Sequence, residues 1–207
     1  MNSTSAVPPN APRGRVQFLL LATLFFFPLL LSFGLNYWFP GLKPSGTTNY
    51  GQLVNPPQAL PPMRLVEAGV EAPADETLFR GRWSYIVTAA GDCDDSCLRA
   101  LVMSRQVRLA MNEKRSRIQR VLVLGDPSTV NPVAARLAPE HPDLHVVAET
   151  DASPVLREFL QPPGAAIYLS DPLGNWMLVY PALTDTQTDF KGLQEDIKKL
   201  LRLSRIG

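Results

Sequence analysis

The sequence predicts an α/β fold preceded by one N-terminal transmembrane helix. Apolar, β-rich runs alternate with helix-like segments over the C-terminal part of the 207-residue chain, and this alternation is typical of parallel β-α-β units. Residues 16–39 contain no Lys, Arg, Asp or Glu and are long enough to cross a bilayer. The chain's two cysteines, Cys93 and Cys97, form a C-x-x-x-C loop just after the first β-rich run.

Residues 16–39 are expected to form an uncleaved membrane anchor. Pro28 lies in the middle of the span, where a membrane helix tolerates proline better than a soluble helix does. Tyr37 and Trp38 suit the aromatic belt at the membrane surface. A cleaved signal peptide is the alternative, but the apolar stretch is longer than usual for one, and no A-x-A-like site follows it before Pro40.

The charges around the span predict its orientation. Arg13 and Arg15 precede it, whereas Lys43 is the one basic residue soon after it. The positive-inside rule therefore places residues 1–15 in the cytoplasm as a short tail and the rest of the chain on the other side of the membrane.

A proline-rich linker, residues 40–62, is expected between the anchor and one soluble domain, residues 63–207. The linker has six prolines and few core-forming runs, which favours extended polyproline conformation, with a full reach of roughly 70 Å. Every Asp and Glu lies at Glu67 or later. Tyr50 is an isolated aromatic residue in this segment. The sequence leaves open whether its side chain docks on the domain or has no role.

The net charge of +1 gives no signal for nucleic-acid binding, and no nucleic-acid partner is expected. The basic residues Lys114, Arg115, Arg117 and Arg120 are interpreted as the solvated end of a helix and the loop after it.

The expected elements of the domain follow from hydrophobic periodicity. Three β-rich runs surround a helix-like segment, a turn-linked pair of runs predicts a hairpin, and an amphipathic helix with Thr188 or Asp189 as its N-cap ends the chain. These elements are the strands 83–90, 121–124 and 144–147, the helix 98–112, the hairpin strands 165–169 and 176–180, and the final helix.

One face of the helix 98–112 is expected to be core. Ala100, Met103, Val107, Ala110 and Met111 recur at helical spacing. The two methionines are thioether groups that can bind copper, but an apolar stripe is the commoner reason for methionine on a helix.

The C-x-x-x-C loop is the candidate reactive site. A helix N-terminus favours the thiolate, which is both the nucleophile and the ligand for soft metals. The loop therefore predicts a redox switch or a copper(I) site, and a permanent structural disulfide is the alternative. Asp94 and Asp95 are expected to raise the pKa values of the thiols, and Asp92 or Asp94 is a candidate helix cap.

The two sulfurs are expected to differ in role. Cys97 lies further into a helix in which Ala100 and Leu101 belong to the buried side. Cys93 is therefore expected to be the exposed, attacking cysteine and Cys97 the resolving one.

The order of elements, with Pro-Pro-Gly leading into the hairpin, resembles the thioredoxin fold over residues 63–203. Within that superfamily, the C-x-x-x-C spacing, the anchor and the hairpin Ala-Ile-Tyr-Leu-Ser-Asp-Pro-Leu-Gly resemble the Sco/SenC group of cytochrome c oxidase assembly proteins, more specifically the small anchored Sco-like proteins of proteobacteria. The resemblance implies delivery of Cu(I) to the oxidase copper site, or reduction of its thiols, by Cys93 and Cys97. The implied partners are an oxidase subunit or other assembly factors, and the implied location is the bacterial inner membrane with a periplasmic domain.

One position departs from the Sco pattern. Sco proteins carry a histidine before the hairpin Asp-Pro as the third copper ligand, and the best-matching residue here is Pro163. A third ligand would then have to come from methionine, water or a partner. His141 and His145 are expected to be solvated loop residues away from the copper site.

Pro163 has a second interpretation from the resemblance, as the cis-proline that faces the dithiol in thioredoxin-like redox proteins. Pro162 precedes it and lacks the N–H that such proteins offer to a docked peptide. If the Gln161–Pro162 bond is the cis one, that N–H is retained. A general membrane-anchored thiol-disulfide oxidoreductase and a redox-silent thioredoxin-like binding module therefore stay open as alternative functions.

Overall fold

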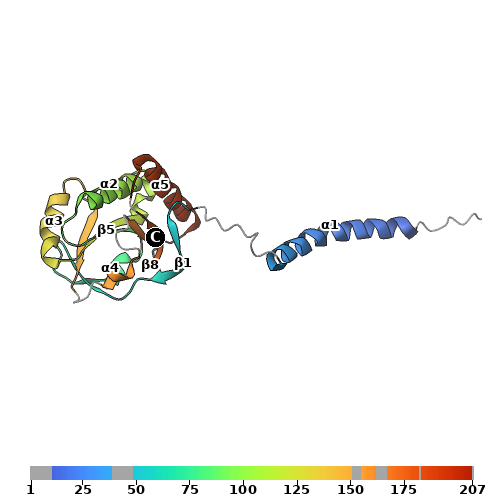
Figure 1. Cartoon of the computed structure of the whole chain (residues 1–207), viewed down its shortest axis with the longest axis horizontal. Helices are drawn as coiled ribbons and strands as arrows, with labels where there is room; N and C mark the ends of the chain where they lie inside the picture. The colour runs from blue at the N-terminus through green and yellow to red at the C-terminus, as the bar shows by residue number, and fades with distance from the viewer. Residues whose placement is uncertain (1–10, 39–48, 151–154, 162–166, 182, 207) are drawn as a thin grey trace, which may run out of the picture. The chain divides into compact units, whose positions relative to one another are not determined.

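The computed structural model describes residues 11–38, 49–150, 155–161, 167–181 and 183–206. The chain divides into two compact units, residues 1–47 and residues 48–207. The first contains helix α1 (Ala11–Trp38), and the second contains the mixed sheet and its covering helices (Figure 1).

Helix α1 contains the expected span, and it begins at Ala11 rather than at residue 16. Its apolar stretch Gly14–Leu35 has a mean hydropathy of 2.4 and is long enough to cross a membrane. Pro28 lies inside the helix without ending it. Phe25 and Phe33 are about three-quarters exposed, at 77% and 75%. Such exposed aromatic side chains suit a lipid environment, and the membrane crossing itself stays a prediction.

Within the described residues the sheet has eight strands in the order β1-β8-β7-β4-β5-β6-β2-β3. Strands β4, β5 and β6 are parallel, and the β7–β8 hairpin joins β4 in antiparallel register. The strands are β1 (Gln52–Ala59), β2 (Arg64–Glu67), β3 (Ala74–Asp75), β4 (Trp83–Ala89), β5 (Ile118–Leu124), β6 (Leu144–Glu149), β7 (Ile167–Ser170) and β8 (Asn175–Tyr180). The parallel unit and the hairpin predicted from the sequence are confirmed, and the hairpin turns where Asp171 accepts hydrogen bonds from the N–H groups of Leu173 and Asn175.

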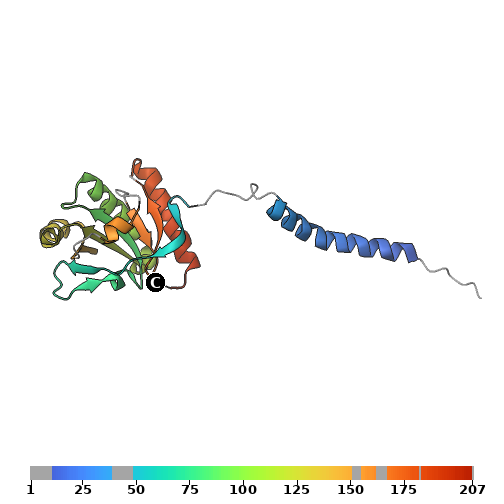
Figure 2. The same cartoon turned by 60° about the horizontal axis from the view of Figure 1, so that its bottom comes forward.

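Helices cover both faces of this sheet (Figures 1 and 2). Helices α2 (Asp95–Leu109), α3 (Val130–Leu137) and α5 (Thr186–Leu203) pack on one face, and α4 (Val155–Phe159) with the 3-10 turn η2 (Glu76–Phe79) packs on the other. The remaining 3-10 turns are η3 (Asn112–Arg117) and η4 (Pro127–Thr129). Helix α2 ends at Leu109 rather than at residue 112, so Met111 lies just beyond it. Met103 and Met111 are both buried in the core on the α2 side of the sheet, which confirms the core interpretation of the two methionines.

The N-terminal boundaries of two helices differ from the prediction because aspartates cap them earlier. Helix α2 begins three residues before Leu98, with Asp94 as its N-cap. Helix α5 begins at Thr186, where the Asp185 carboxylate accepts a hydrogen bond from the Gln187 N–H. Asp189, a predicted cap, is instead buried inside the first turn.

The expected linker is too long at its C-terminal end. Residues 52–59 form strand β1, which pairs with β8 at the edge of the sheet, and Leu60 is buried beyond it. The folded unit thus begins near Thr48 rather than at Met63. An edge strand tolerates Pro56 and Pro57 because it does not need every N–H for pairing, and polyproline and β conformations are close neighbours in backbone angle.

The interpretation of the basic stretch as solvated is wrong for two of its four residues. Lys114 and Arg115 are exposed. Arg117 instead donates to the Leu201 carbonyl in the last turn of α5 and to the Ser204 and Ile206 carbonyls beyond the helix. Arg120 lies in β5 with 1% of its surface exposed, because α2 and Asp143 supply enough acceptors to satisfy a buried guanidinium.

Candidate dithiol site

The two cysteines lie at the junction of β4 and α2, as the sequence predicts. Strand β4 ends at Ala89 and α2 begins at Asp95, so Cys93 lies in the connecting loop and Cys97 in the first helical turn. They form a disulfide with their Cα atoms 5.3 Å apart. The site therefore sits where parallel strands end at their carboxyl side and a helix begins.

Aspartates hold the backbone around both cysteines. The Asp94 carboxylate accepts hydrogen bonds from the Cys97 N–H at 2.9 Å and from the Ser96 hydroxyl at 2.7 Å. The Cys97 N–H, followed by the Ser96 hydroxyl, lowers the pKa of Asp94. Asp94 is thus the helix cap, whereas Asp92 accepts from the Cys93 N–H at 2.8 Å within the loop. Both carboxylates fix the backbone on which the sulfurs sit.

A residue of α3 also holds the loop. Arg136 pairs with the Asp92 carboxylate and donates to the Cys93 carbonyl oxygen at 3.4 Å. Sequence reasoning missed Arg136 because it is 43 residues from Cys93 and its approach depends on the β-α-β crossover. Its position in the last turn of a short amphipathic helix is the only local signal.

The expected difference in exposure between the cysteines is wrong for the disulfide form. Cys93 is 4% exposed and Cys97 is 5% exposed, and both belong to the core cluster beneath α2. The loop folds inward, so its first cysteine is buried as deeply as the one within the helix. A reacting partner must therefore displace the loop to reach either sulfur of the disulfide.

Neither histidine is a solvated loop residue. His141 is 3% exposed, and the Arg120 guanidinium donates to its Nδ1 at 3.2 Å. Burial, and then the charge of Arg120, lowers the pKa of His141. His145 lies in β6 with its Nδ1 2.6 Å from the Glu67 carboxylate. Strand β6 begins at Leu144, as predicted, so His145 is a strand residue, whereas His141 lies in the loop before the strand but is buried.

Copper can be held here only through the reduced cysteines. Two thiolates can bind Cu(I) in linear geometry, whereas a disulfide offers no thiolate. Across the described ranges, no three His, Cys, Asp or Glu side chains gather in a way that could hold a metal ion. Pro162 and Pro163 lie outside the described residues, so the predicted role of Pro163 stays a prediction. The sulfur pair fits Cu(I), and a third protein ligand is not supplied by either histidine.

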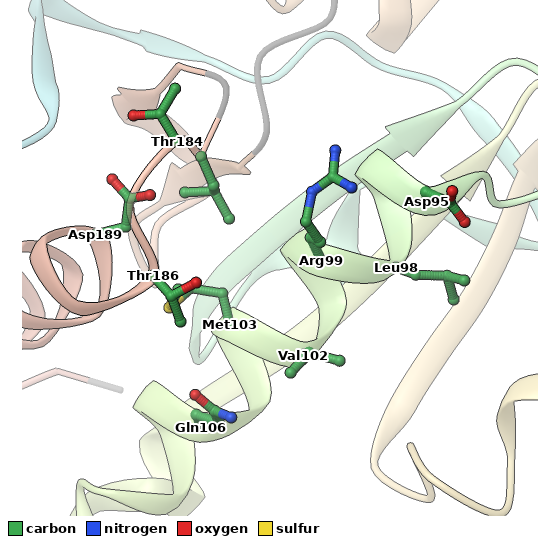
Figure 3. Close-up of a pocket in the computed structure, with 10 residues that line it drawn as sticks. Asp95, Leu98, Arg99, Val102, Met103, Gln106, Thr184, Thr186 and Asp189 are labelled. Atoms are coloured by element: carbon green, nitrogen blue, oxygen red, sulfur yellow. The ribbon is translucent and has the colours of Figure 1, made fainter.

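A groove of about 650 Å³ lies beside the site, between α2 and the segment that leads into α5 (Figure 3). On α2 it is lined by Asp95, Leu98, Arg99, Val102, Met103 and Gln106. These positions share one helical face, and Cys97 falls on the opposite face by helical geometry. The groove therefore flanks the dithiol helix without leading to its sulfurs.

Comparison with solved structures shows that this fold is shared with Sco proteins. Yeast Sco1 superposes with a TM-score of 0.56 at 18% identity, covering 73% of this chain and 98% of that one. Copper-bound ScoI of Bradyrhizobium japonicum gives 0.52 at 17% identity, covering 68% and 98%. A SCO1/SenC family lipoprotein of Bacillus anthracis gives 0.54 at 14% identity, covering 72% and 99%. At these identities the likeness shows the thioredoxin-like fold, as the order of elements in the sequence predicts.

Comparison by sequence places the chain in a family. No curated protein matches it. The family model of the transmembrane-like, thioredoxin-like, C-terminal domain matches residues 83–204, from the first residue of β4 to just beyond α5. Because this match spans more than half of the 207 residues, the chain belongs to the family of transmembrane-like, thioredoxin-like C-terminal domains.

Proposed function

We propose that this protein is a membrane-tethered, Sco-like assembly factor for cytochrome c oxidase. In this role Cys93 and Cys97 either carry Cu(I) or reduce the thiols of the oxidase copper site, on the periplasmic side of a bacterial inner membrane. The observation that carries the proposal is the cysteine pair at the β4–α2 junction, in a fold shared with a Sco protein solved with copper bound. The apolar helix α1 supports the tether.

In the copper reaction, the two reduced cysteines release their thiol protons to solvent and both sulfurs bind the Cu(I) ion, which is cargo rather than a resident cofactor. Asp94 is ionised at neutral pH, and hydrogen bonds from the Cys97 N–H and then the Ser96 hydroxyl lower its pKa further. A carboxylate beside the thiols attracts a cation and disfavours a free thiolate. This environment suits sulfurs that are deprotonated by metal binding better than sulfurs that act as free nucleophiles.

In the thiol reaction, reduced Cys93 or Cys97 attacks a disulfide of the partner and forms a mixed disulfide, while one partner sulfur leaves and takes up a proton. The second cysteine then attacks the mixed disulfide and releases the other partner thiol. Two electrons have passed to the partner, and the protein ends with the Cys93–Cys97 disulfide seen here. A general thiol-disulfide oxidoreductase would use the same steps on any protein disulfide.

Burial of the disulfide favours a second candidate, a redox-silent binding module. Both cysteines are within the core, at 4% and 5% exposure, and a buried disulfide reacts slowly with external thiols. Such a module would keep its fold and its partner after both cysteines are replaced by serine.

The test is anaerobic titration of the reduced full-length protein in detergent with Cu(I) against a competing chelator. We expect one Cu(I) per chain, lost in the Cys93→Ser and Cys97→Ser variants. Pro163→His should tighten binding if it restores the Sco ligand, while His141→Ala and His145→Ala should not weaken it. Lack of copper binding by the reduced protein, together with turnover on model disulfides, would favour the oxidoreductase. If the reduced protein neither binds copper nor exchanges disulfides, the result would favour the redox-silent binding module.

A further inference from the structure

Strand β1 pairs with β8 only near its two ends, and between them the partly buried Val54 is the strand residue that packs against the core. Its residues 52–53 pair with Val179 and Leu178, and its residues 58–59 pair with Trp176 and Asn175, with an irregularity between them. Pro56 and Pro57 lie in that irregular stretch and have no N–H to donate. Seven of the eight side chains are exposed. Little apolar burial therefore holds this strand, in contrast to the buried strands β4 and β5.

A cluster of hydrogen bonds on α5 fixes the N-terminal end of β1. The Tyr50 hydroxyl donates to Asp189 at 2.5 Å, and the N–H groups of Tyr50 and Gly51 donate to the two oxygens of Asp196 at 3.0 and 2.8 Å. The hydrogen bond to Asp189 is the first cause that raises the pKa of Tyr50 to about 12, so the hydroxyl stays a donor at neutral pH. Residues 50–59 are called the strap below.

Gly192 has no side chain, and the Tyr50 ring lies in the space that a side chain there would fill. A Cβ atom on Gly192 would lie 2.1 Å from Cγ of Tyr50, far inside van der Waals contact. The ring thus lies directly on the α5 backbone, while 44% of the residue stays exposed. The contact is specific, but it buries little area.

Both carboxylates keep a partner when the strap is absent. Asp196 also accepts from the Tyr180 hydroxyl at 3.2 Å, and Asp189 also accepts from the Asp185 N–H at 3.0 Å. Removing the strap therefore admits water to two carboxylates that retain a hydrogen bond, rather than leaving a buried charge without a partner. Local opening of the strap is physically separable from unfolding of the sheet.

We propose that the strap is a releasable part of the tether, docked on β8 and α5 in this structure and able to detach while the rest of the domain stays folded. With the strap docked, ten residues, 39–48, join the last residue of α1 to Asn49, and a chain of that length spans at most about 40 Å. With the strap detached, the connection extends to Leu60 and spans at most about 80 Å. Release therefore roughly doubles the maximum span of the connection and lets the dithiol work further from the membrane.

The linker-like composition of residues 40–62 fits a strap that can detach. A permanent edge strand would be expected to carry β-branched residues and alternate buried side chains. The strap instead carries two prolines and exposed polar residues, which remain soluble when detached. The release itself does not depend on the proposed function, whereas its consequence for reach rests on the proposed membrane anchor.

Hydrogen exchange of the full-length protein in nanodiscs tests the release. We expect the amides of Tyr50, Gly51 and the paired strap residues to exchange well before those of β4 and β5. Tyr50→Phe removes one hydrogen bond and should speed exchange of the strap about tenfold. Tyr37→Phe, a tyrosine in α1 that is 77% exposed, is the matched control and should change nothing. Strap amides that exchange together with β4, or that are unaffected by Tyr50→Phe, would overturn the proposal.

Gly192→Ala provides a second and stronger variant, because the Cβ of the alanine would overlap the position of the Tyr50 ring. The expected result is a strap that exchanges without protection while β4 and β5 keep theirs. Energy transfer from a dye at position 113 (Glu113→Cys) to an acceptor lipid should fall in the same variant. Equal loss of protection throughout the sheet would show that the strap is an integral strand. A detached strap with unchanged energy transfer would refute the proposed increase in the distance between the domain and the membrane.

Discussion

The Arg136 guanidinium on α3 donates to the carbonyl oxygen of Cys93, at 3.4 Å. This contact joins the reactive loop to a helix that the chain reaches only after one further strand. Together with the pair between Arg136 and Asp92, it fixes the loop from outside, while Asp94 fixes it from the helix side. The position of Cys93 is thus set by residues from two separate elements.

Arg136→Gln should loosen the loop with little cost to the fold. Arg136 and Asp92 are 45% and 71% exposed, and exposed ion pairs contribute at most about 1 kcal/mol. We expect the free energy of unfolding in urea to fall by less than that amount, while dithiothreitol reduces the Cys93–Cys97 disulfide faster. Arg115→Gln changes an exposed arginine of η3 and is the control. An unchanged rate of reduction would show that Arg136 does not restrain the loop.

Arg120→Met should destabilise the domain by about 3 kcal/mol. The Arg120 guanidinium donates to the Leu101 carbonyl at 2.7 Å and to the Ser104 hydroxyl at 3.1 Å, both on α2, and it pairs with Asp143 at 3.1 Å. Methionine fills the space but removes all of these hydrogen bonds, although Asp143 keeps its pair with Arg108 at 3.2 Å and the Leu101 carbonyl still accepts from the Ser104 hydroxyl at 3.0 Å. Urea unfolding followed by circular dichroism measures the loss. A change below about 1 kcal/mol would mean that burial of the charge itself cancels most of its contacts.

The sequence predicts the five central strands of the sheet, β4 to β8, because each contains an apolar run. Strand β5 is buried at every position, and the β7–β8 turn carries Asp171 and Gly174 at the places that its geometry requires. Strands β2 and β3 are short, and β1 is exposed and proline-containing. Local pattern cannot identify these strands, since each is extended only because a neighbouring strand pairs with it.

The candidate site divides in the same way. The two cysteines and the capping aspartate are close in sequence, so spacing predicts the cysteine pair and limits the helix cap to Asp92 or Asp94. The contact of Arg136 with the loop, and that of Arg120 with His141, join residues brought together by the β-α-β crossover. A charged residue in a β-rich run is ambiguous in sequence, because its burial depends on acceptors contributed by distant elements.

The orientation of α1 can be tested with paired fusions to the C-terminus. Arg13 and Arg15 precede the apolar span, and the positive-inside rule then predicts a domain outside the cytoplasm. An alkaline phosphatase fusion should be active and a green fluorescent protein fusion dark. Replacing both arginines by glutamine should weaken this preference. Bright fluorescence with inactive phosphatase would reverse the orientation.

The stability of the domain should fall as the pH drops below about 6.5, because His141 is buried as the neutral imidazole. Its Nδ1 accepts from Arg120 at 3.2 Å, and burial followed by the charge of Arg120 lowers its pKa from the model-peptide value of 6.5. The unfolded chain therefore binds a proton at a higher pH than the folded protein does. This contribution to stability is complete above the unfolded pKa and is lost as the pH falls toward the lowered folded pKa.

His141→Asn isolates this effect, because the asparagine oxygen can accept from Arg120 and does not titrate. Urea unfolding of both proteins between about pH 7.5 and pH 5 should show a steeper loss for the wild type than for His141→Asn, and the difference between the two curves should develop below about pH 6.5. Parallel curves for the wild type and His141→Asn would show that protonation of His141 costs the folded state nothing, and that its contact with Arg120 does not require the neutral ring.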